Sequence, residues 1–108
     1  MAGGKRFVAV FDSGLGGISV LRRLVDALPH EDFVYVGDSA HNPYGERSPR
    51  QILSLSRQIV GGLVREGAKA VVIACNTATS VAAATLRREL STIPIVGVEP
   101  ALKPATEH

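Results

Sequence analysis

Residues 7–17 read FVAVFDSGLGG, an apolar run that ends in an aspartate and a glycine-rich turn. The first five of these residues are hydrophobic without alternation, which is typical of a strand covered on both faces of a parallel sheet. From Ile18 to Leu28 the apolar residues then recur at helical spacing, and the pattern stops before Pro29. A strand, a glycine turn and a helix in this order predict the start of a β-α-β fold.

The same alternation continues along the chain. Further apolar runs predict strands at residues 33–36, 70–74 and 95–98, and amphipathic runs predict helices at 49–66 and 81–90. The order βαβαβαβ with right-handed crossovers predicts a doubly wound parallel sheet, in a flavodoxin-like α/β domain of three layers. A last helix start is predicted at Pro100.

The second helix carries its own boundary signals. Ser48 can act as the N-cap, Pro49 suits the first turn, and Gly67 follows the last apolar residue of the helix. The internal pair Gly61-Gly62 leaves two interpretations open, because it either weakens this helix or lets another backbone approach it closely.

The composition excludes several classes of protein. A chain of 108 residues that is 45% hydrophobic can bury a core, and we expect residues 1–108 to form one domain. The net charge of +2 is spread over single bases and pairs, which argues against a nucleic-acid partner. No apolar stretch approaches the roughly 20 residues of a membrane span, and no signal-peptide core follows the start. We therefore expect a cytoplasmic protein without a membrane partner.

Polar and reactive side chains follow each predicted strand at its carboxyl end, where open α/β sheets bind their ligands. These residues are Asp12 and Ser13 after the first strand, Asp38 and His41 after the second, Cys75, Asn76 and Thr77 after the third, and Glu99 after the fourth. Because the carboxyl ends of parallel strands share one edge of the sheet, the sequence predicts a small-molecule site there.

The glycine loop has three interpretations. Gly14 and Gly16 between a strand and a helix are similar to a dinucleotide-binding fingerprint. Ser19 replaces the third glycine, however, and the carboxylate of Asp12 would repel a pyrophosphate. The glycines otherwise serve a tight turn, or the loop presents Asp12 and Ser13 to a small polar ligand.

Cys75 is the only cysteine, which excludes an internal disulfide and a multi-cysteine zinc site. A free cysteine is most often a buried hydrophobic residue. Cys75, however, ends a strand and precedes a helix, where backbone N–H groups and the helix dipole favour a thiolate that acts as nucleophile or general base. Hydrolytic catalysis would need an orienting histidine, and His41 is the one candidate near this edge.

The long connection after the second strand contains the turn Pro43-Tyr44-Gly45. Tyr44 either offers its phenol to a ligand or covers the edge of the sheet. Arg47 and Arg50 follow, and they either attract a carboxylate or remain ordinary surface residues. Connections of this length are often functional.

Taken together, these segments resemble the motifs of glutamate racemases. The segments are DSGLGG at 12–17, YVGDS at 35–39, PYG at 43–45, ACNTAT at 74–79 and IVGVEP at 95–100. The resemblance runs from about Arg6 to the end of the chain, and Asn42 stands where some members have a cysteine. It implies cofactor-independent interconversion of L- and D-glutamate, which supplies D-glutamate for peptidoglycan and so serves cell-wall biogenesis and cell shape.

The resemblance also implies roles for individual residues. In that family, one cysteine thiolate removes the proton from the substrate Cα, and a second cysteine delivers a proton to the opposite face. Cys75 matches the first cysteine, and Asp12 would tune its proton transfer. The residues implied to bind glutamate are Asp12, Ser13, Pro43, Tyr44, Gly45, Asn76 and Thr77, and neither a metal nor a cofactor is implied.

Length separates this chain from the family, whose members are well over twice as long and carry the second cysteine in a second, similar domain. We therefore expect an N-terminal domain that is inactive alone, and that associates into homo-oligomers through its exposed sheet edge. Two alternatives remain: a racemase of aspartate or another amino acid, and a non-catalytic flavodoxin-like module that binds a phosphate ligand.

Overall fold

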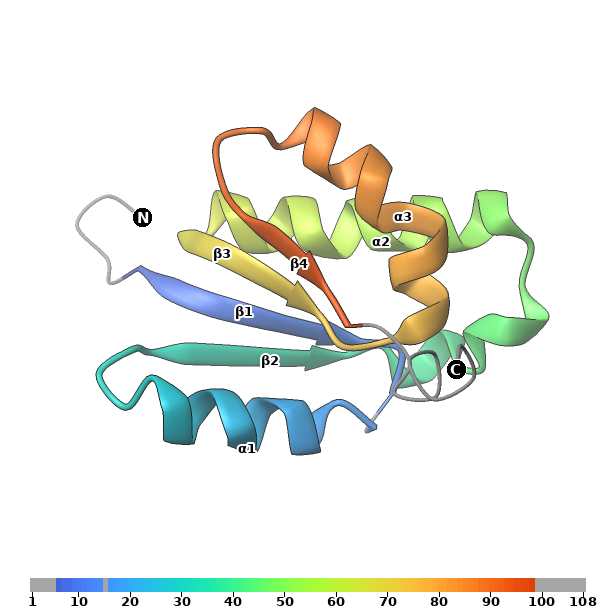
Figure 1. Ribbon diagram of the computed structural model, residues 1–108. Helices are drawn as coiled ribbons and strands as arrows, with labels where there is room; N and C mark the ends of the chain where they lie inside the picture. The colour runs from blue at the N-terminus through green and yellow to red at the C-terminus, as the bar shows by residue number, and fades with distance from the viewer. Residues whose placement is uncertain (1–5, 15, 99–108) are drawn as a thin grey trace, which may run out of the picture.

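The computed structural model describes residues 6–14 and 16–98, so Leu15 and the predicted Glu99 and Pro100 features lie outside the described residues. Strands and helices alternate along the chain (Figure 1). The order is β1 (Phe7–Asp12), α1 (Ile18–Ala27), β2 (Phe33–Gly37), the 3₁₀ turns η1 (Ser39–His41) and η2 (Tyr44–Glu46), α2 (Pro49–Arg65), β3 (Ala68–Ile73), α3 (Asn76–Glu89) and β4 (Ile95–Gly97).

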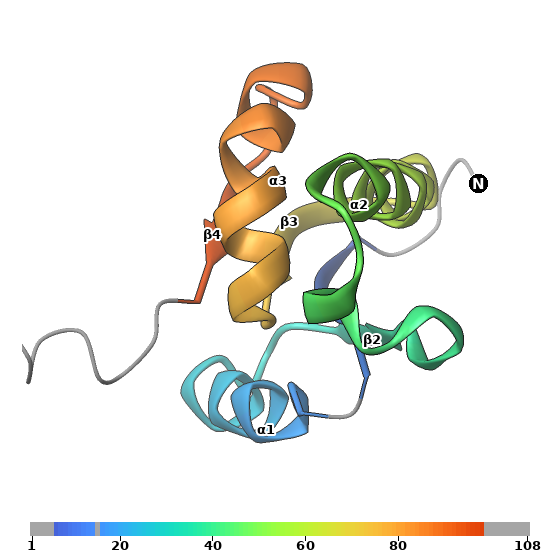
Figure 2. The same cartoon turned by 90° about the vertical axis from the view of Figure 1, so that its right-hand side faces the viewer.

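The four strands form one parallel sheet in the order β2-β1-β3-β4. Helix α1 lies on one face of this sheet, and α2 and α3 lie on the other (Figure 2). The chain leaves β1 toward β2 through α1 and later returns to the other side of β1 through α2, and this reversal places the helices on opposite faces. The predicted doubly wound, three-layer α/β fold is confirmed.

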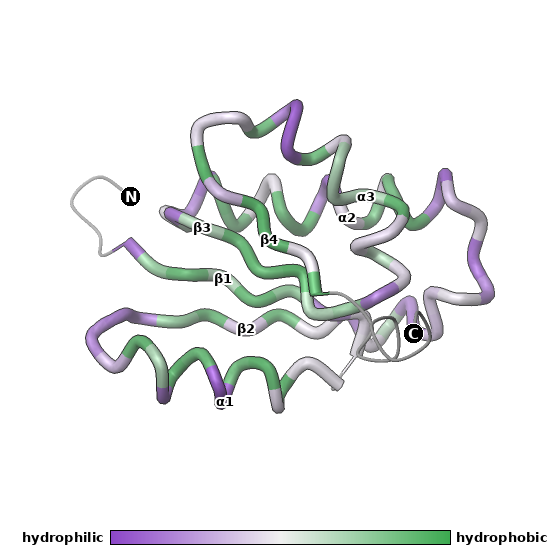
Figure 3. The backbone as a smooth tube through the Cα atoms, viewed as in Figure 1, coloured by the Kyte–Doolittle hydropathy of each residue, from purple (hydrophilic) through white to green (hydrophobic). Residues whose placement is uncertain are grey.

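The main core lies between the sheet and the pair α2 and α3. Hydrophobic residues are concentrated in the strands (Figure 3), and Ala9 and Phe11 of β1 are completely buried. Three alanines and one leucine of α3 face this core, and the small side chains let the helix approach the sheet closely; they are Ala78, Ala82, Ala83 and Leu86.

Helix α2 begins and ends as its sequence predicts. The Ser48 hydroxyl accepts a hydrogen bond from the Gln51 amide, and the Gln51 side chain accepts one from the Ser48 amide. Gly67 follows the helix with a φ of 117°, a conformation that favours glycine. A Cβ at Gly61 or Gly62 would meet only the Arg65 guanidinium, at 3.5 or 3.8 Å. The interpretation that this pair admits another backbone is therefore wrong.

Helix α3 differs most from its prediction, since it begins at Asn76 and not at Val81. The first turn is rich in polar residues, which hides the apolar period there. Its Thr79 hydroxyl donates to the carbonyl oxygen of Ile73, 3.3 Å away, so a polar side chain stabilises the junction between β3 and the helix. Strand β3 also begins earlier, at Ala68, and β4 is limited to three residues.

Candidate active site

The carboxyl ends of β1 and β3 are neighbours in the sheet. Phe11 pairs with Ile73, and the Ala74 amide donates to the Phe11 carbonyl oxygen over 2.7 Å. Asp12 ends β1 and Cys75 follows β3, so the two residues predicted to carry chemistry stand on adjacent strands. This is the point where the connections of the sheet change direction, and such points are where doubly wound folds bind ligands.

The Asp12 carboxylate is buried and held in place. Its Oδ2 accepts a hydrogen bond of 2.7 Å from the amide of Gly17, at the start of α1. A Cβ on Gly17 would lie 2.8 Å from the Ala74 Cβ, so only glycine lets the loop approach β3 this closely. The carboxylate thus occupies the helix N-terminus where a dinucleotide phosphate would bind, which argues against the dinucleotide interpretation.

Tyr35 supports the same loop from β2. Its hydroxyl donates to the Gly14 carbonyl oxygen at 2.7 Å and lies 3.4 Å from Asp12 Oδ2. Burial raises the pKa of Tyr35, and the negative charge and hydrogen bonding of Asp12 raise it further. The sequence shows Tyr35 only as part of a strand motif, because nothing in the strand pattern indicates that its hydroxyl reaches the glycine loop.

Cys75 stands at the N-cap of α3, as its position after the strand predicts. Its half-buried Sγ accepts a hydrogen bond of 3.4 Å from the Ala78 amide. The sulfur therefore meets the N-terminal end of a helix, where unpaired N–H groups and the helix dipole favour a negative charge. A thiolate is the form of cysteine that abstracts protons and attacks carbon.

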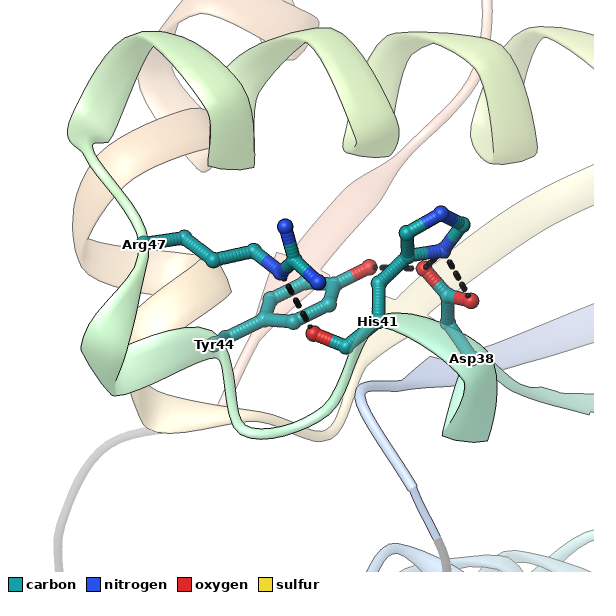
Figure 4. A network of polar contacts seen from close by, with 4 residues as sticks. All are labelled: Asp38, His41, Tyr44 and Arg47. Atoms are coloured by element: carbon teal, nitrogen blue, oxygen red, sulfur yellow. Dashed lines mark hydrogen bonds and ion pairs between the residues drawn. The ribbon is translucent and has the colours of Figure 1, made fainter.

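A polar network connects the loop after β2 with this edge (Figure 4). Asp38 accepts a hydrogen bond from the Tyr44 hydroxyl at 2.7 Å and contacts His41 Nδ1 at 2.8 and 3.1 Å. The ring of Tyr44 is tilted by 58° against Phe11, with 6.3 Å between the ring centroids. Burial raises the pKa of Tyr44, as do its hydrogen bond to Asp38 and the nearby charges of Asp38 and Cys75.

The network also answers two questions from the sequence. His41 binds Asp38 with Nδ1, so within the described residues Cys75 has no histidine that orients it for hydrolysis. Tyr44 is 2% exposed and covers the end of the sheet, although its hydroxyl is also engaged. Sequence reasoning grouped Asp38 with the polar residues that follow the strands and did not find its contact with Tyr44.

The other predicted site residues lie in the loops after β1 and β2 and in the first turn of α3. Ser13 and Thr77 are half-buried, and Asn76, Pro43 and Gly45 are exposed, so these residues remain accessible to a ligand. The Asn42–Pro43 peptide bond is cis. No cluster of three or more potential metal ligands occurs within residues 6–14 and 16–98. Over the same residues, no helix is both long and apolar enough to cross a membrane.

Comparison with known proteins shows what this arrangement is similar to. No protein-family model matches the chain. Glutamate racemase from Clostridium perfringens strain 13 is 57% identical over 98 residues, which is 91% of this chain and 38% of the relative. Glutamate racemase from Bifidobacterium animalis subsp. lactis is 59% identical over 101 residues, or 94% of this chain and 39% of the relative.

Solved structures agree with the sequence comparison. The crystal structure of glutamate racemase from Thermus thermophilus, in complex with β-chloro-D-alanine, superimposes with a TM-score of 0.84 at 45% identity, covering 95% of this chain and 40% of that one. By sequence and by structure, the chain is similar to glutamate racemases over part of their length. Escherichia coli glutamate racemase, in complex with L-glutamate and the activator UDP-MurNAc-ala, also has a TM-score of 0.84, at 38% identity over 94% of this chain and 38% of its own.

The chain spans about two fifths of the length of these glutamate racemases, at 38–40% of each. It contains Cys75 and no other cysteine. The sequence motifs that resemble glutamate racemase, and the fold that places them at one sheet edge, therefore belong to one part of the racemase architecture.

Proposed function

We propose that this chain carries one half of the two-base active site of a glutamate racemase, with Cys75 as its proton-transfer residue. The observation that carries the proposal is the position of Cys75 Sγ at the N-terminus of α3, directly after β3, the strand that pairs with the Asp12 strand β1. The Cys75 thiolate takes the proton from the substrate Cα, which leaves the electron pair on that carbon. A proton donor on the opposite face then completes the inversion.

Asp12 is a positioning residue in this proposal. Its carboxylate is fixed by the Gly17 amide at the end of β1, the strand that pairs with β3, so its negative charge stays at the sheet edge that also carries Cys75. We assign this fixed charge the role of tuning the proton transfer of Cys75.

The accessible polar groups hold the substrate. Ser13, Asn76 and Thr77 offer hydrogen bonds to the carboxylates and the amino group of glutamate, and the backbone around Pro43-Tyr44-Gly45 closes the site from the other side. Their accessibility in the segments that follow β1, β2 and β3 supports this assignment. The positive end of α3 further favours a carboxylate ligand.

The wider role follows from the family. We propose that residues 1–108 are the N-terminal domain of the racemase, acting in the cytoplasm without a cofactor to supply D-glutamate for peptidoglycan. Because the second base lies outside this chain, the chain alone binds substrate but does not racemise it.

A test of this proposal needs a protein that also contains the second catalytic base. A chimera in which this chain replaces the matching segment of the Clostridium perfringens relative is incubated with L-glutamate in D₂O, and the loss of the α-proton signal is followed by NMR. We expect α-proton exchange and formation of D-glutamate, followed by circular dichroism, with the chimera, and no D-glutamate from the chain alone, because inversion needs the second base. Cys75→Ser keeps an N-cap oxygen on α3, so it separates chemistry from folding, and it should lower the exchange rate about 10²- to 10⁴-fold.

The matched control is Ser80→Ala, an exposed position on the same helix, which should leave the rate unchanged. A Cys75→Ser chimera as active as its parent would reduce Cys75 to a capping residue. Faster exchange with aspartate than with glutamate would favour the alternative racemase. A folded chimera that exchanges neither substrate but binds mononucleotides would favour the non-catalytic module.

A further inference from the structure

A cleft of about 370 Å³ opens between the loop after β2 and the first turns of α2. Its lining residues are His41, Arg47, Arg50, Gln51, Ser54 and Leu55. None of the residues proposed to bind glutamate is among them. The volume lies within the range of about 300–1,000 Å³ that is usual for small-molecule sites.

The lining is cationic. Arg47 and Arg50 each bring a guanidinium group, and no carboxylate residue lines the cleft. Arg47 donates from Nε to the His41 carbonyl oxygen over 2.7 Å, which orients the group and leaves its two terminal nitrogens without a hydrogen bond to the described residues. Arg50 has no hydrogen bond or ion pair to the described residues. The next arginine of α2, Arg57, is by contrast paired with Glu89 at 2.6 Å.

The remaining groups fit an anion that is held by side chains. The capping box at Ser48 already uses the Gln51 amide of α2, and Pro49 has no N–H, so the backbone of this helix end has little to offer. The Gln51 side-chain oxygen accepts from Ser48, which leaves its NH₂ group to donate. Ser54 adds a hydroxyl, and Leu55 adds an apolar wall.

We propose that this cleft binds a small organic oxyanion that carries two negative charges, either a phosphate monoester or a dicarboxylate. Arg47 and Arg50 bind the charged group, since the guanidinium fork matches both oxyanions. Gln51 and Ser54 donate to the remaining oxygens, and Leu55 packs against the carbon part of the ligand. The site is distinct from the proposed glutamate site, and the proposal does not rest on racemase activity.

The test is a direct titration of the 108-residue chain. ¹⁵N–¹H NMR follows the amides of Arg50, Gln51 and Ser54 while inorganic phosphate or succinate is added at constant ionic strength, with sodium chloride as the blank. We expect saturable shifts at these amides with at least one probe, and the tighter probe identifies the anion class. Arg50→Gln should weaken binding about tenfold, the effect of losing one charged hydrogen bond. The affinity of Arg50→Lys, which keeps the charge but loses the guanidinium fork, should lie between those of the parent chain and Arg50→Gln.

Two controls make the result decisive. Arg23 is an exposed arginine of α1 without a partner among the described residues, and Arg23→Gln should change the affinity less than about twofold, as a distant surface charge does. Equal losses in Arg50→Gln and Arg23→Gln, or shifts that never saturate, would overturn the proposal. Thr77→Val should leave phosphate binding unchanged. If it weakens binding as much as Arg50→Gln does, the anion occupies the candidate active site and the cleft is not a separate site.

Discussion

Tyr44 is the largest fully buried side chain of the described residues, and its hydroxyl has one partner, the Asp38 carboxylate. Such a phenol cannot ionise at low cost, because burial and the charges of Asp38 and Cys75 all oppose a phenolate. The pKa of Tyr44 in the folded chain is therefore above 10, its value in the unfolded chain. Folding stability from this group is complete below pH 10 and is lost as the pH rises further.

Tyr44→Phe keeps the ring against Phe11 and removes only the hydroxyl. We expect it to lower the free energy of unfolding by about 2 kcal/mol at pH 8, as for a hydrogen bond to a charged group. This difference should shrink between pH 10 and pH 11, because only the parent protein loses stability through Tyr44 ionisation. Urea unfolding of both proteins at several pH values measures it. Parallel stability curves would mean that the Tyr44 phenol is not shielded.

For single residues, the sequence predicts the place in the site when that place depends only on the position of the residue in the chain. Asp12 and Cys75 could be placed at one edge because each follows a strand. The hydrogen-bond partners of Tyr35 and His41 could not be predicted, because these contacts depend on side-chain directions across the sheet and in a loop. The sequence offered His41 to Cys75, whereas the fold of η1 turns it toward Asp38.

Among the elements, α2 contains an internal glycine that lowers the stability of the fold. Glycine inside a helix is less favourable than alanine by about 0.5–1 kcal/mol. At Gly61 a Cβ would meet only the flexible end of Arg65, 3.5 Å away. Gly61→Ala should therefore raise the free energy of unfolding by up to about 1 kcal/mol in a denaturant titration.

Gly17→Ala is the contrasting substitution. Its Cβ would lie 2.8 Å from the Ala74 Cβ and 3.1 Å from the Asp12 Cβ, so the glycine loop must move away from β3. Such overpacking costs about 1–3 kcal/mol. A loss of stability in Gly61→Ala, or none in Gly17→Ala, would contradict these backbone contacts.

The elements also show why boundaries are harder to predict than order. Strands and helices alternate as the apolar runs indicate, since a buried parallel strand must be hydrophobic on both faces. The start of α3 was misplaced because Asn76, Thr77 and Thr79 show no apolar period. The helix begins there because Cys75 caps it, and the sequence alone treats that cysteine as a reactive group and not as a cap.

In the molecule as a whole, the helices cover the two faces of the sheet unequally. Two helices pack on one face of the sheet, whereas α1 alone lies on the other and has no fully buried residue. Val96 of β4 is 51% exposed, and Val25 of α1 and Leu28, the C-cap of that helix, are both 44% exposed. Ile95 points into the core, so Val96 points to the face that carries α1. An edge strand with an exposed apolar side chain is a site for association.

We therefore expect the 108-residue chain to self-associate at high concentration. Val96→Lys, which places a charge on the edge strand, should shift the sedimentation velocity profile toward monomer. Thermal unfolding should show little change, because Val96 is mostly exposed. The same substitution at exposed Ser80, on α3, is the control. A parent chain that sediments as a monomer throughout would contradict the expectation.

The strand order also governs how the molecule assembles during synthesis. Strand β1 leaves the ribosome first, yet it lies between β2 and β3, and β3 begins only at Ala68. Until that segment emerges, β1 has one unpaired edge, and the core around Ala9 and Phe11 lacks helix α3, which follows β3 in the chain. Contacts between distant parts of a chain form slowly. We expect the nascent chain to stay open until residues 68–73 have emerged and then to close around β1 in one step.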